Sequence, residues 1–324
     1  MKKEHSVVMD ELKSQLDCID TVVPPGSKII YLDYPLHFNV GDQLIYLGTL
    51  EFFEKKGYVV EGFYSEHNLD VDSLSCDSED TIILFHGGGN FGDLYPKHQF
   101  FRESVVKKFP KNKIVVLPQT IYFIDDSVKK SSAEVFSQHS DLTIYARDQQ
   151  SYNIACKFSD KCFLMPDMAH YLWQTPFLNK HSYVSEKADS DVVLLQDRVD
   201  FESAGVGLSG EDKNKVVFDW YELLPFWLYK ACSVLSVLSK VSKNNGFMSK
   251  LINYFWMCIS RKSVSLSAKK INGHAKFVTT RLHGHIFAQL ISHPNVILDN
   301  KYGKIRNYAN CWTIESDMVE KGRI

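Results

Sequence analysis

Hydrophobic residues in the first half of the chain form six short runs separated by polar segments. The runs cover residues 28–32, 58–63, 81–85, 114–117, 142–145 and 162–165. Runs of this length are typical of strands buried on both faces. Between the first two, leucines at 44, 47 and 50 follow a helical spacing, and Lys55 and Lys56 before Gly57 are typical of a helix end. Strands alternating with helices predict a mainly parallel, doubly wound sheet.

A polar segment at 179–189 separates these runs from a second set. The second set has three apolar runs, at 192–195, 276–279 and 295–298, with a long helical pattern at 217–271 between the first two. We therefore predict an α/β protein with an N-terminal domain at 1–178 and a second domain at 190–300 that carries a helical insertion. Residues 301–324 form a tail that we expect to pack back on the first domain.

The insertion is unusually apolar. Residues 223–238 contain one charged side chain, Lys230, and one proline, Pro225. A helix that spans a bilayer needs about 20 apolar residues, so this shorter stretch is not expected to cross one. Its aromatic and lysine side chains suit a helix lying at a membrane surface. Two interpretations stay open: a helical hairpin packed on its own domain or on a second copy of the chain, and peripheral membrane contact through residues 217–260.

Composition narrows the class of ligand and the compartment. The formal net charge is -2, with 37 Lys plus Arg and 39 Asp plus Glu, so no general attraction to nucleic acid is expected and any anion site must be local. The seven cysteines are scattered without a C-x-x-C pair, which argues against a disulfide framework or a zinc site. We expect a cytoplasmic protein, at most peripheral to the inner face of the membrane, without a metal site.

The segment after the run at 276–279 has the clearest chemical pattern. Arg281, His283 and His285 follow this predicted strand directly. On an extended backbone Arg281 and His283 point to one side. Arg281 then suits a carboxylate or phosphate, and His283 suits proton transfer. In the alternative interpretation Arg281 pairs with a neighbouring aspartate and the histidines cap a helix. His285 would orient its neighbours or contact substrate.

A glycine cluster follows the run at 81–85. His86 precedes Gly87, Gly88 and Gly89, and Asn90 comes next. Glycines allow a ligand to approach the backbone, whose N–H groups can bind an anion. The same residues also make an ordinary tight turn. The pattern is neither a dinucleotide nor a nucleoside triphosphate motif. Gly88, Gly89 and Asn90 are therefore candidate substrate contacts.

Further candidates also lie at predicted strand ends. Asn39 and Asp42 precede the first long helix, where Asp42 would either cap the helix or accept a proton from a hydroxyl. Arg147 follows the run at 142–145, with Ser151 one turn later, and Lys304 is a further possible anion contact. Two arginines from two domains facing one cleft suit a small ligand with two or three negative charges.

Several of these segments, taken in order, resemble the polysaccharide pyruvyltransferase family. The matching stretches are residues 38–45, 86–93, 117–120, 146–148 with Ser151, 166–167 and 280–285. Residues 298–304 and 312–313 add a likeness to members that act in bacterial exopolysaccharide synthesis. The resemblance spans about residues 30–312, and its specificity comes from the order of the motifs.

The resemblance implies a ketal-forming transferase with two Rossmann-like domains arranged as in GT-B glycosyltransferases. Such enzymes move the enolpyruvyl unit of phosphoenolpyruvate onto two hydroxyls of a sugar or lipid-linked oligosaccharide and release phosphate, without a further cofactor. Carried over, Arg147 and Arg281 would hold phosphoenolpyruvate, His283 would be the acid/base and Asp42 its partner. The alternatives are a sugar-nucleotide-dependent glycosyltransferase and a non-catalytic scaffold of a polysaccharide synthesis complex. A homo-oligomer is compatible with each.

Overall fold

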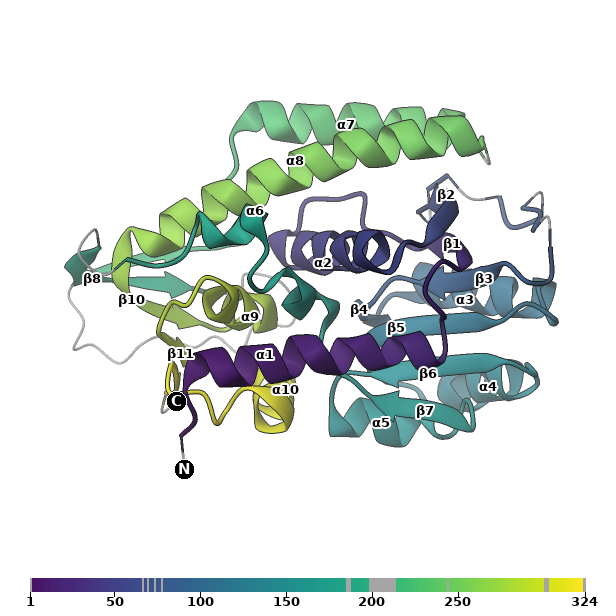
Figure 1. Cartoon of the computed structure of the whole chain (residues 1–324), viewed down its shortest axis with the longest axis horizontal. Coiled ribbons are helices and arrows are strands. Elements are labelled where there is room, and N and C mark those ends of the chain that lie inside the picture. Colours follow the sequence, from purple (N-terminus) through teal and green to yellow (C-terminus); the bar gives the residue numbers. More distant parts are fainter. Residues whose placement is uncertain are drawn as a thin grey trace.

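The computed structural model describes residues 2–322 except 66, 69, 73, 77, 185–187, 198–213, 244 and 300–302. Three residues of the predicted motif at 298–304 therefore lie outside the described residues. The described chain is an α/β protein with two parallel sheets, which confirms the predicted class (Figure 1).

The first sheet has the order β2-β1-β3-β5-β6-β7, with β4 paired to β5, and all its ladders are parallel. The six predicted strands are present with small shifts at their ends. The strands are β1 (Lys28–Leu32), β2 (Val59–Tyr64), β3 (Ile82–Phe85), β4 (Gly88–Phe91), β5 (Ile114–Ile121), β6 (Leu142–Ala146) and β7 (Lys161–Leu164). The helices of this half are α1 (His5–Leu16), α2 (Val40–Lys56), α3 (Pro96–Lys108), α4 (Asp126–Ser137), α5 (Gln149–Ala155) and α6 (Pro176–Asn179), with short 3₁₀ turns η1 (Asp17–Thr21) and η2 (Met168–Leu172).

The second sheet has the order β12-β11-β10-β8-β9 and is also parallel throughout. Its strands are β8 (Asp189–Gln196), β9 (Lys215–Phe218), β10 (His274–Thr279), β11 (Asn295–Ile297) and β12 (Val319–Lys321). The other elements are η4 (Trp220–Glu222), α7 (Phe226–Val241), α8 (Gly246–Asn272), α9 (Leu282–Leu290) and α10 (Lys304–Trp312). Three of these strands were predicted, and β9 and β12 are short strands at the two edges that were not. Residues 217–218 of β9 fall inside the predicted helical insertion, whose start is thereby corrected, and β12 has a single apolar residue, Val319.

Strand β4 corrects the interpretation of the glycine cluster as a turn. Gly88 has φ +122°, which side chains rarely adopt, and a Cβ on Gly87 would lie 2.8 Å from the carbonyl oxygen of Pro118 on β5. The glycines therefore let β4 pack closely against β5. Because glycine weakens strands in general, this segment does not look like one in the sequence.

The insertion forms a hairpin of α7 and α8, but it does not pack only on its own half. α8 contacts α2 and β2 of the first half, as well as β10. Tyr46 of α2 donates a hydrogen bond from Oη to Oδ1 of Asn253 at 2.5 Å, and Trp256 is fully buried. Figure 1 shows α8 above α2, with α7 as the outermost layer. The expectation that the hairpin covers its own domain is corrected to one that joins both halves.

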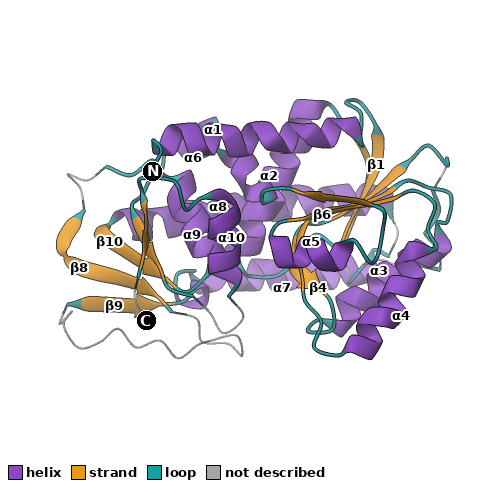
Figure 2. Ribbon diagram, turned by 90° about the horizontal axis from the view of Figure 1, so that it is seen from below, coloured by secondary structure: helices purple, strands orange, loops and turns teal. Residues whose placement is uncertain are grey.

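Both ends of the chain also link the halves. α1 extends alongside both halves (Figure 2) and contacts η2 and α9. His5 Nε2 lies 2.9 Å from the carbonyl oxygen of Gln289. In the C-terminal segment, Trp312 donates from Nε1 to the carbonyl of Arg147 at 2.7 Å, while β12 pairs with β11. The C-terminal residues thus contact both halves, and one hydrophobic core cluster contains residues of each.

Within the described part of the chain, none of the helices has both the length and the apolar character needed to cross a bilayer.

Candidate functional site

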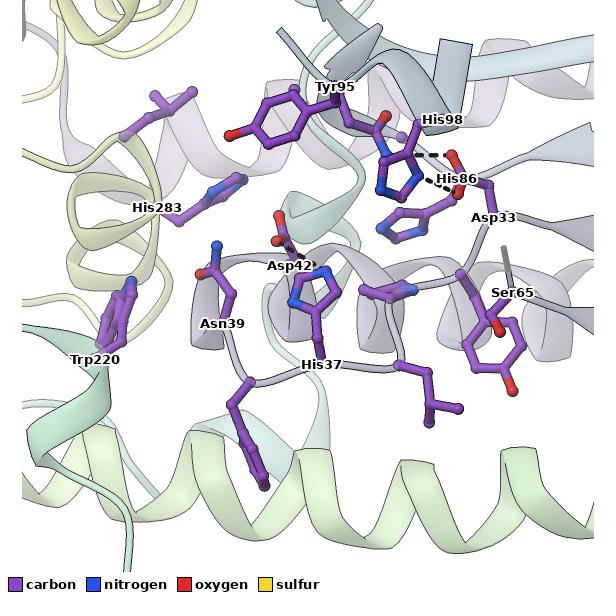
Figure 3. Close-up of a pocket in the computed structure, with 18 of the residues that line it drawn as sticks. Asp33, His37, Asn39, Asp42, Ser65, His86, Tyr95, His98, Trp220 and His283 are labelled. Carbon is purple, nitrogen blue, oxygen red and sulfur yellow. Dashed lines mark hydrogen bonds and ion pairs between the residues drawn. The ribbon is translucent and has the colours of Figure 1, made fainter. Parts of the chain in front are cut away.

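A pocket of about 360 Å³ lies where the two halves meet (Figure 3). Asp33, His86 and Arg147 line it from the ends of β1, β3 and β6, and Arg281 lines it from the end of β10. In parallel sheets the carboxyl ends of the strands are the usual place for ligands. The carboxyl ends of strands from both sheets therefore face the same cavity.

Four helices also begin at the pocket. Lining residues stand at or near the first turns of α2, α3, α9 and α10, namely Asn39, Tyr95, Leu282 and Lys304. Helix starts present N–H groups and a partial positive charge. Helix N-termini therefore add to the arginine and lysine side chains in attracting an anion to the cavity.

Asp42 lies in the first turn of α2 but does not cap it. Asn39 is the cap: its Oδ1 accepts a hydrogen bond from the Gly41 N–H at 3.0 Å. The carboxylate of Asp42 lines the pocket, 3.7 Å from Nε2 of His37. Of the two interpretations of Asp42, the capping role is excluded, and its role as a base stays a prediction.

Arg147, Asp167 and His283 form a cluster across the two halves. Arg147 donates from Nη1 to Oδ2 of Asp167 at 2.7 Å, and Nε2 of His283 lies 3.3 Å from the same oxygen. Burial opposes the ionisation of Asp167, but the hydrogen bond with His283 and the nearby charges outweigh it and hold the pKa of this carboxyl well below its usual range. Asp167 therefore remains a carboxylate that orients both partners.

Further hydrogen bonds, through Thr120 and Asp148, fix the guanidinium of Arg147. Its Nε donates to Oγ1 of Thr120 at 2.8 Å, and Thr120 donates to Oδ2 of Asp148 at 3.1 Å. Ser151 donates to the same Asp148 oxygen at 2.8 Å and accepts from the Ile121 N–H. Ser151 is fully buried and is not among the pocket-lining residues that the structure describes. Its predicted substrate contact is therefore corrected to a supporting role.

Arg281 and His283 both line the pocket, although the backbone is not extended from one to the other. Arg281 is the last extended residue, and α9 begins at Leu282. Arg281 donates from Nε and Nη2 to the two carboxylate oxygens of Asp219, at 2.6 and 2.5 Å. This is the ion pair of the alternative interpretation, although Arg281 still lines the pocket. The predicted extended backbone from Arg281 to His283 is therefore wrong, but both residues line one pocket.

His285 is a buried structural residue. It is fully buried, with Nδ1 2.8 Å from Asn295 Oδ1 and Nε2 2.7 Å from Thr313 Oγ1. Burial lowers the pKa of His285 to about 4, so the ring is neutral near pH 7. His285 is not among the described residues that line the pocket. Its candidate substrate contact is thereby corrected, and its orienting role fits the geometry.

The glycine cluster contributes unequally to the pocket. Gly89 lines it, and a Cβ there would lie 3.0 Å from Nη2 of Arg147. Gly88 is not among the described residues that line the pocket, and a Cβ there would lie 3.4 Å from Cδ1 of Ile45. Its candidate substrate contact is therefore corrected to a packing role. Asn90 lines the pocket while its Nδ2 donates to Asp33 at 3.2 Å.

Asp33 and its partners form a second polar cluster that the sequence interpretation missed. Asp33 accepts hydrogen bonds from Nη2 of the buried Arg102 at 2.8 Å and contacts Nδ1 of His98 at 2.7 Å. It has φ 62°, unusual outside glycine. Figure 3 shows His98 and Asp33 beside His86 on the first half of the pocket. The available signal for Asp33 was its position directly after β1.

His86 has an unusual environment. Its Nδ1 lies 2.5 Å from Oη of Tyr31, and Nε2 has no hydrogen-bond partner among the described residues. Burial lowers the pKa of His86 to about 4, although the nearby carboxylates partly oppose this shift. A neutral, incompletely bonded imidazole in the wall of a pocket is suited to a hydrogen bond with a ligand.

Comparisons with known proteins agree with this arrangement of motifs. The sequence profile of the family described as "Polysaccharide pyruvyl transferase" matches residues 39–302. The chain is 34% identical to the "Putative pyruvyl transferase EpsO" of Bacillus subtilis, over 96% of this chain and 93% of that protein. It is 26% identical to "Pyruvyl transferase 1" of Schizosaccharomyces pombe, over 88% and 70% of the two chains.

A solved structure shares the fold. The crystal structure of an uncharacterized protein from Klebsiella pneumoniae aligns with a TM-score of 0.63 at 19% identity, covering 97% of this chain and 98% of that one. The profile covers most of the sequence, including Arg147 and the segment at 280–285 that meet in the pocket. The chain therefore belongs to the polysaccharide pyruvyl transferase family.

Proposed function

We propose that this pyruvyltransferase takes the enolpyruvyl unit of phosphoenolpyruvate and joins it to two hydroxyls of a sugar as a cyclic ketal in exopolysaccharide synthesis. The observation that carries this proposal is the convergence of Arg147, Arg281, Lys304 and His283 on one pocket with several helix starts. Guanidinium groups and helix N-termini are suited to the carboxylate and phosphate of a compact anionic donor.

Arg147 is the best placed anion contact. Its Nε and Nη1 are held by Thr120 and Asp167, and Nη2 lies toward Gly89 in the wall of the pocket. We assign Nη2 and the backbone at Gly89 to one end of phosphoenolpyruvate. Arg281, fixed by Asp219, and Lys304 are assigned to the other end.

The reaction requires two proton movements. One sugar hydroxyl adds to C2 of the enol as its proton is removed, and a proton is delivered to C3, which becomes a methyl group. The C2–O bond to phosphate then breaks, and the second hydroxyl closes the ketal while its proton leaves with phosphate. We assign proton delivery to His283 and removal to Asp42, because both line the pocket at the start of their helices.

The acceptor is assigned to residues that line the pocket and that the donor assignment does not use. Tyr95, Trp220 and Tyr221 give apolar faces there, and His98, His86 and Asn90 give groups that can bond sugar hydroxyls. Pockets for small ligands are typically lined by apolar side chains, with a few polar groups that fix the orientation of the ligand. We therefore propose a sugar or lipid-linked oligosaccharide as acceptor.

The test is incubation of the purified protein with phosphoenolpyruvate and lipid-linked oligosaccharides extracted from the source cells. We expect acceptor-dependent phosphate release and an acceptor that gains the mass of one ketal-linked pyruvate. Consumption of a nucleotide sugar with no use of phosphoenolpyruvate would instead support a glycosyltransferase and overturn the proposal.

A further inference from the structure

The outer surface of the α7–α8 hairpin is apolar. In α7 the exposed apolar side chains are Phe226, Trp227, Val234, Val237, Leu238 and Val241. In α8 they are Phe247, Leu251, Tyr254 and Phe255. Phe226, Val241 and Phe247 are 72%, 80% and 76% exposed. With about 3.6 residues per helical turn, these positions fall on one face of each helix. Soluble proteins rarely leave so many large apolar side chains together without a partner.

This outer face is not needed for the fold of the hairpin. The opposite side of α7 buries Leu228, Cys232 and Leu235, and α8 buries Ile252 and Trp256 against the rest of the molecule. α7 is therefore apolar on two sides, and among the described residues only its inner side is covered by the rest of the chain. A helix that is apolar around most of its circumference is expected to be covered on both sides.

The charge of the hairpin indicates what covers it. Between Phe226 and Asn272 the sequence has eight Lys and Arg residues and no Asp or Glu, although the whole chain has a net charge of -2. Lys230, Lys240, Lys243 and Lys250 are exposed along the same part of the hairpin as the apolar residues. Apolar side chains interleaved with lysines are suited to the headgroup region of an anionic membrane.

We propose that residues 226–255 dock the protein on a membrane surface that contains anionic lipid headgroups. A second copy of the chain is a poorer partner, because a symmetric contact through this face would bring two uniformly basic hairpins together. The docking part ends near Phe255, because farther along α8 Glu51 and Glu54 of α2 line a surface groove together with Arg261 and Lys262.

Docking would place the pocket beside the membrane. Phe38 lines the pocket, and its ring centroid lies 4.6 Å from that of Tyr229 on α7 and 5.9 Å from that of Trp256 on α8. The hairpin thus packs directly against the wall of the pocket. Docking itself does not depend on the proposed reaction, since it is measured as binding.

The experiment is flotation of the full chain with vesicles of phosphatidylcholine alone and of phosphatidylcholine with phosphatidylglycerol. We expect the protein to float with the mixed vesicles and to be released as salt is raised, because screening weakens surface attraction. The Lys240→Glu and Lys243→Glu changes should each weaken partitioning by at least about fivefold. Phe226→Ser with Trp227→Ser should also weaken it at every salt concentration.

Matched controls lie on α3, far from the hairpin in the sequence. Phe100 is 72% exposed, like Phe226, and Lys107 is an exposed lysine, so Phe100→Ser and Lys107→Glu should float like the wild type. Circular dichroism checks that each variant folds. Three outcomes would overturn the proposal: no binding to mixed vesicles, equal loss in the control variants, or a dimer that Phe226→Ser with Trp227→Ser dissociates while vesicle binding is absent.

Discussion

Arg147 Nη1 and His283 Nε2 lie 3.4 Å apart, although one residue follows a strand of the first sheet and the other begins a helix of the second. Oδ2 of Asp167 contacts both groups. Neither half contains this arrangement alone. The proposed donor site therefore exists only while the two halves are held together by α1, α8 and the C-terminal residues.

The first prediction concerns His283. If its imidazole delivers the proton to C3, His283→Ala should lower kcat by about 10²–10⁴-fold, the usual contribution of a general acid or base. The measurement is acceptor-dependent phosphate release at saturating phosphoenolpyruvate. His181→Ala, which changes a half-buried histidine outside this pocket, is the control and should keep its kcat. Wild-type turnover in the His283 variant would remove it from the mechanism.

The second prediction uses the close approach of two helix starts. A Cβ added at Gly41 of α2 would lie 2.7 Å from Cβ and Nδ1 of His283, so Gly41→Ala must displace that ring. A misplacement of about 1 Å can cost about 100-fold in rate, and we expect kcat to fall by about that factor while the fold persists.

The control for this prediction is Gly246→Ala at the start of α8. A Cβ there meets its nearest atom, the carbonyl oxygen of Glu61, at 3.8 Å, which is ordinary contact. This variant should be fully active and slightly more stable, because alanine favours helix over glycine. Equal activity in the two variants would show that the position of His283 does not limit turnover.

The sequence predicted the parts of the fold that follow from local burial. The strand at Lys28–Leu32 is found where expected because each of its last four residues is buried and apolar. The positions of Arg147 and Arg281 at the pocket were also predictable, since polar residues just after parallel strands gather at one edge. These inferences need only the pattern along the chain.

The partners of these residues were not predictable, because they depend on tertiary contacts. Asp219 lies 62 residues from Arg281, and nothing in its sequence context marks it as the partner of that guanidinium. Whether the backbone is still extended at His283 depends on where α9 begins, a boundary that sequence patterns locate only to within a few residues. The packing of α8 on α2 likewise follows from the shapes of both helices.

The third prediction separates the two roles of Arg281. If Arg281 contacts phosphoenolpyruvate, Arg281→Lys should raise the KM for this donor about tenfold, because a lysine cannot both pair with Asp219 and reproduce the fork. Asp219→Asn should raise the KM similarly, because it removes the carboxylate that orients the guanidinium. It should also destabilise the fold by about 3 kcal/mol, since it replaces one charged partner of a buried ion pair with a neutral side chain.

The readouts are initial rates across phosphoenolpyruvate concentrations and urea denaturation of each variant. A structural role for Arg281 predicts a different pattern, in which both variants lose stability and the KM for phosphoenolpyruvate stays unchanged. That pattern would assign the donor contact to Arg147 and Lys304 without Arg281.

The last prediction is a loss of stability in mild acid. Burial lowers the pKa of His86 and His285 to about 4 and that of His170 to about 3, whereas an unfolded histidine titrates near pH 6.5. Between about pH 6.5 and pH 4 the unfolded chain therefore binds more protons than the folded one, so stability is complete above this window and falls as the pH is lowered through it. At pH 5 each histidine should cost about 2 kcal/mol. The carboxylates of Asp33 and Asp167, whose pKa values are lowered, titrate below this range.

Urea denaturation between pH 7.5 and pH 5 measures how steeply the free energy of unfolding falls with pH. His285→Gln should make this dependence less steep, even though the change lowers stability at pH 7.5. An unchanged slope in this variant would mean that His285 binds a proton in the folded protein as readily as in the unfolded chain.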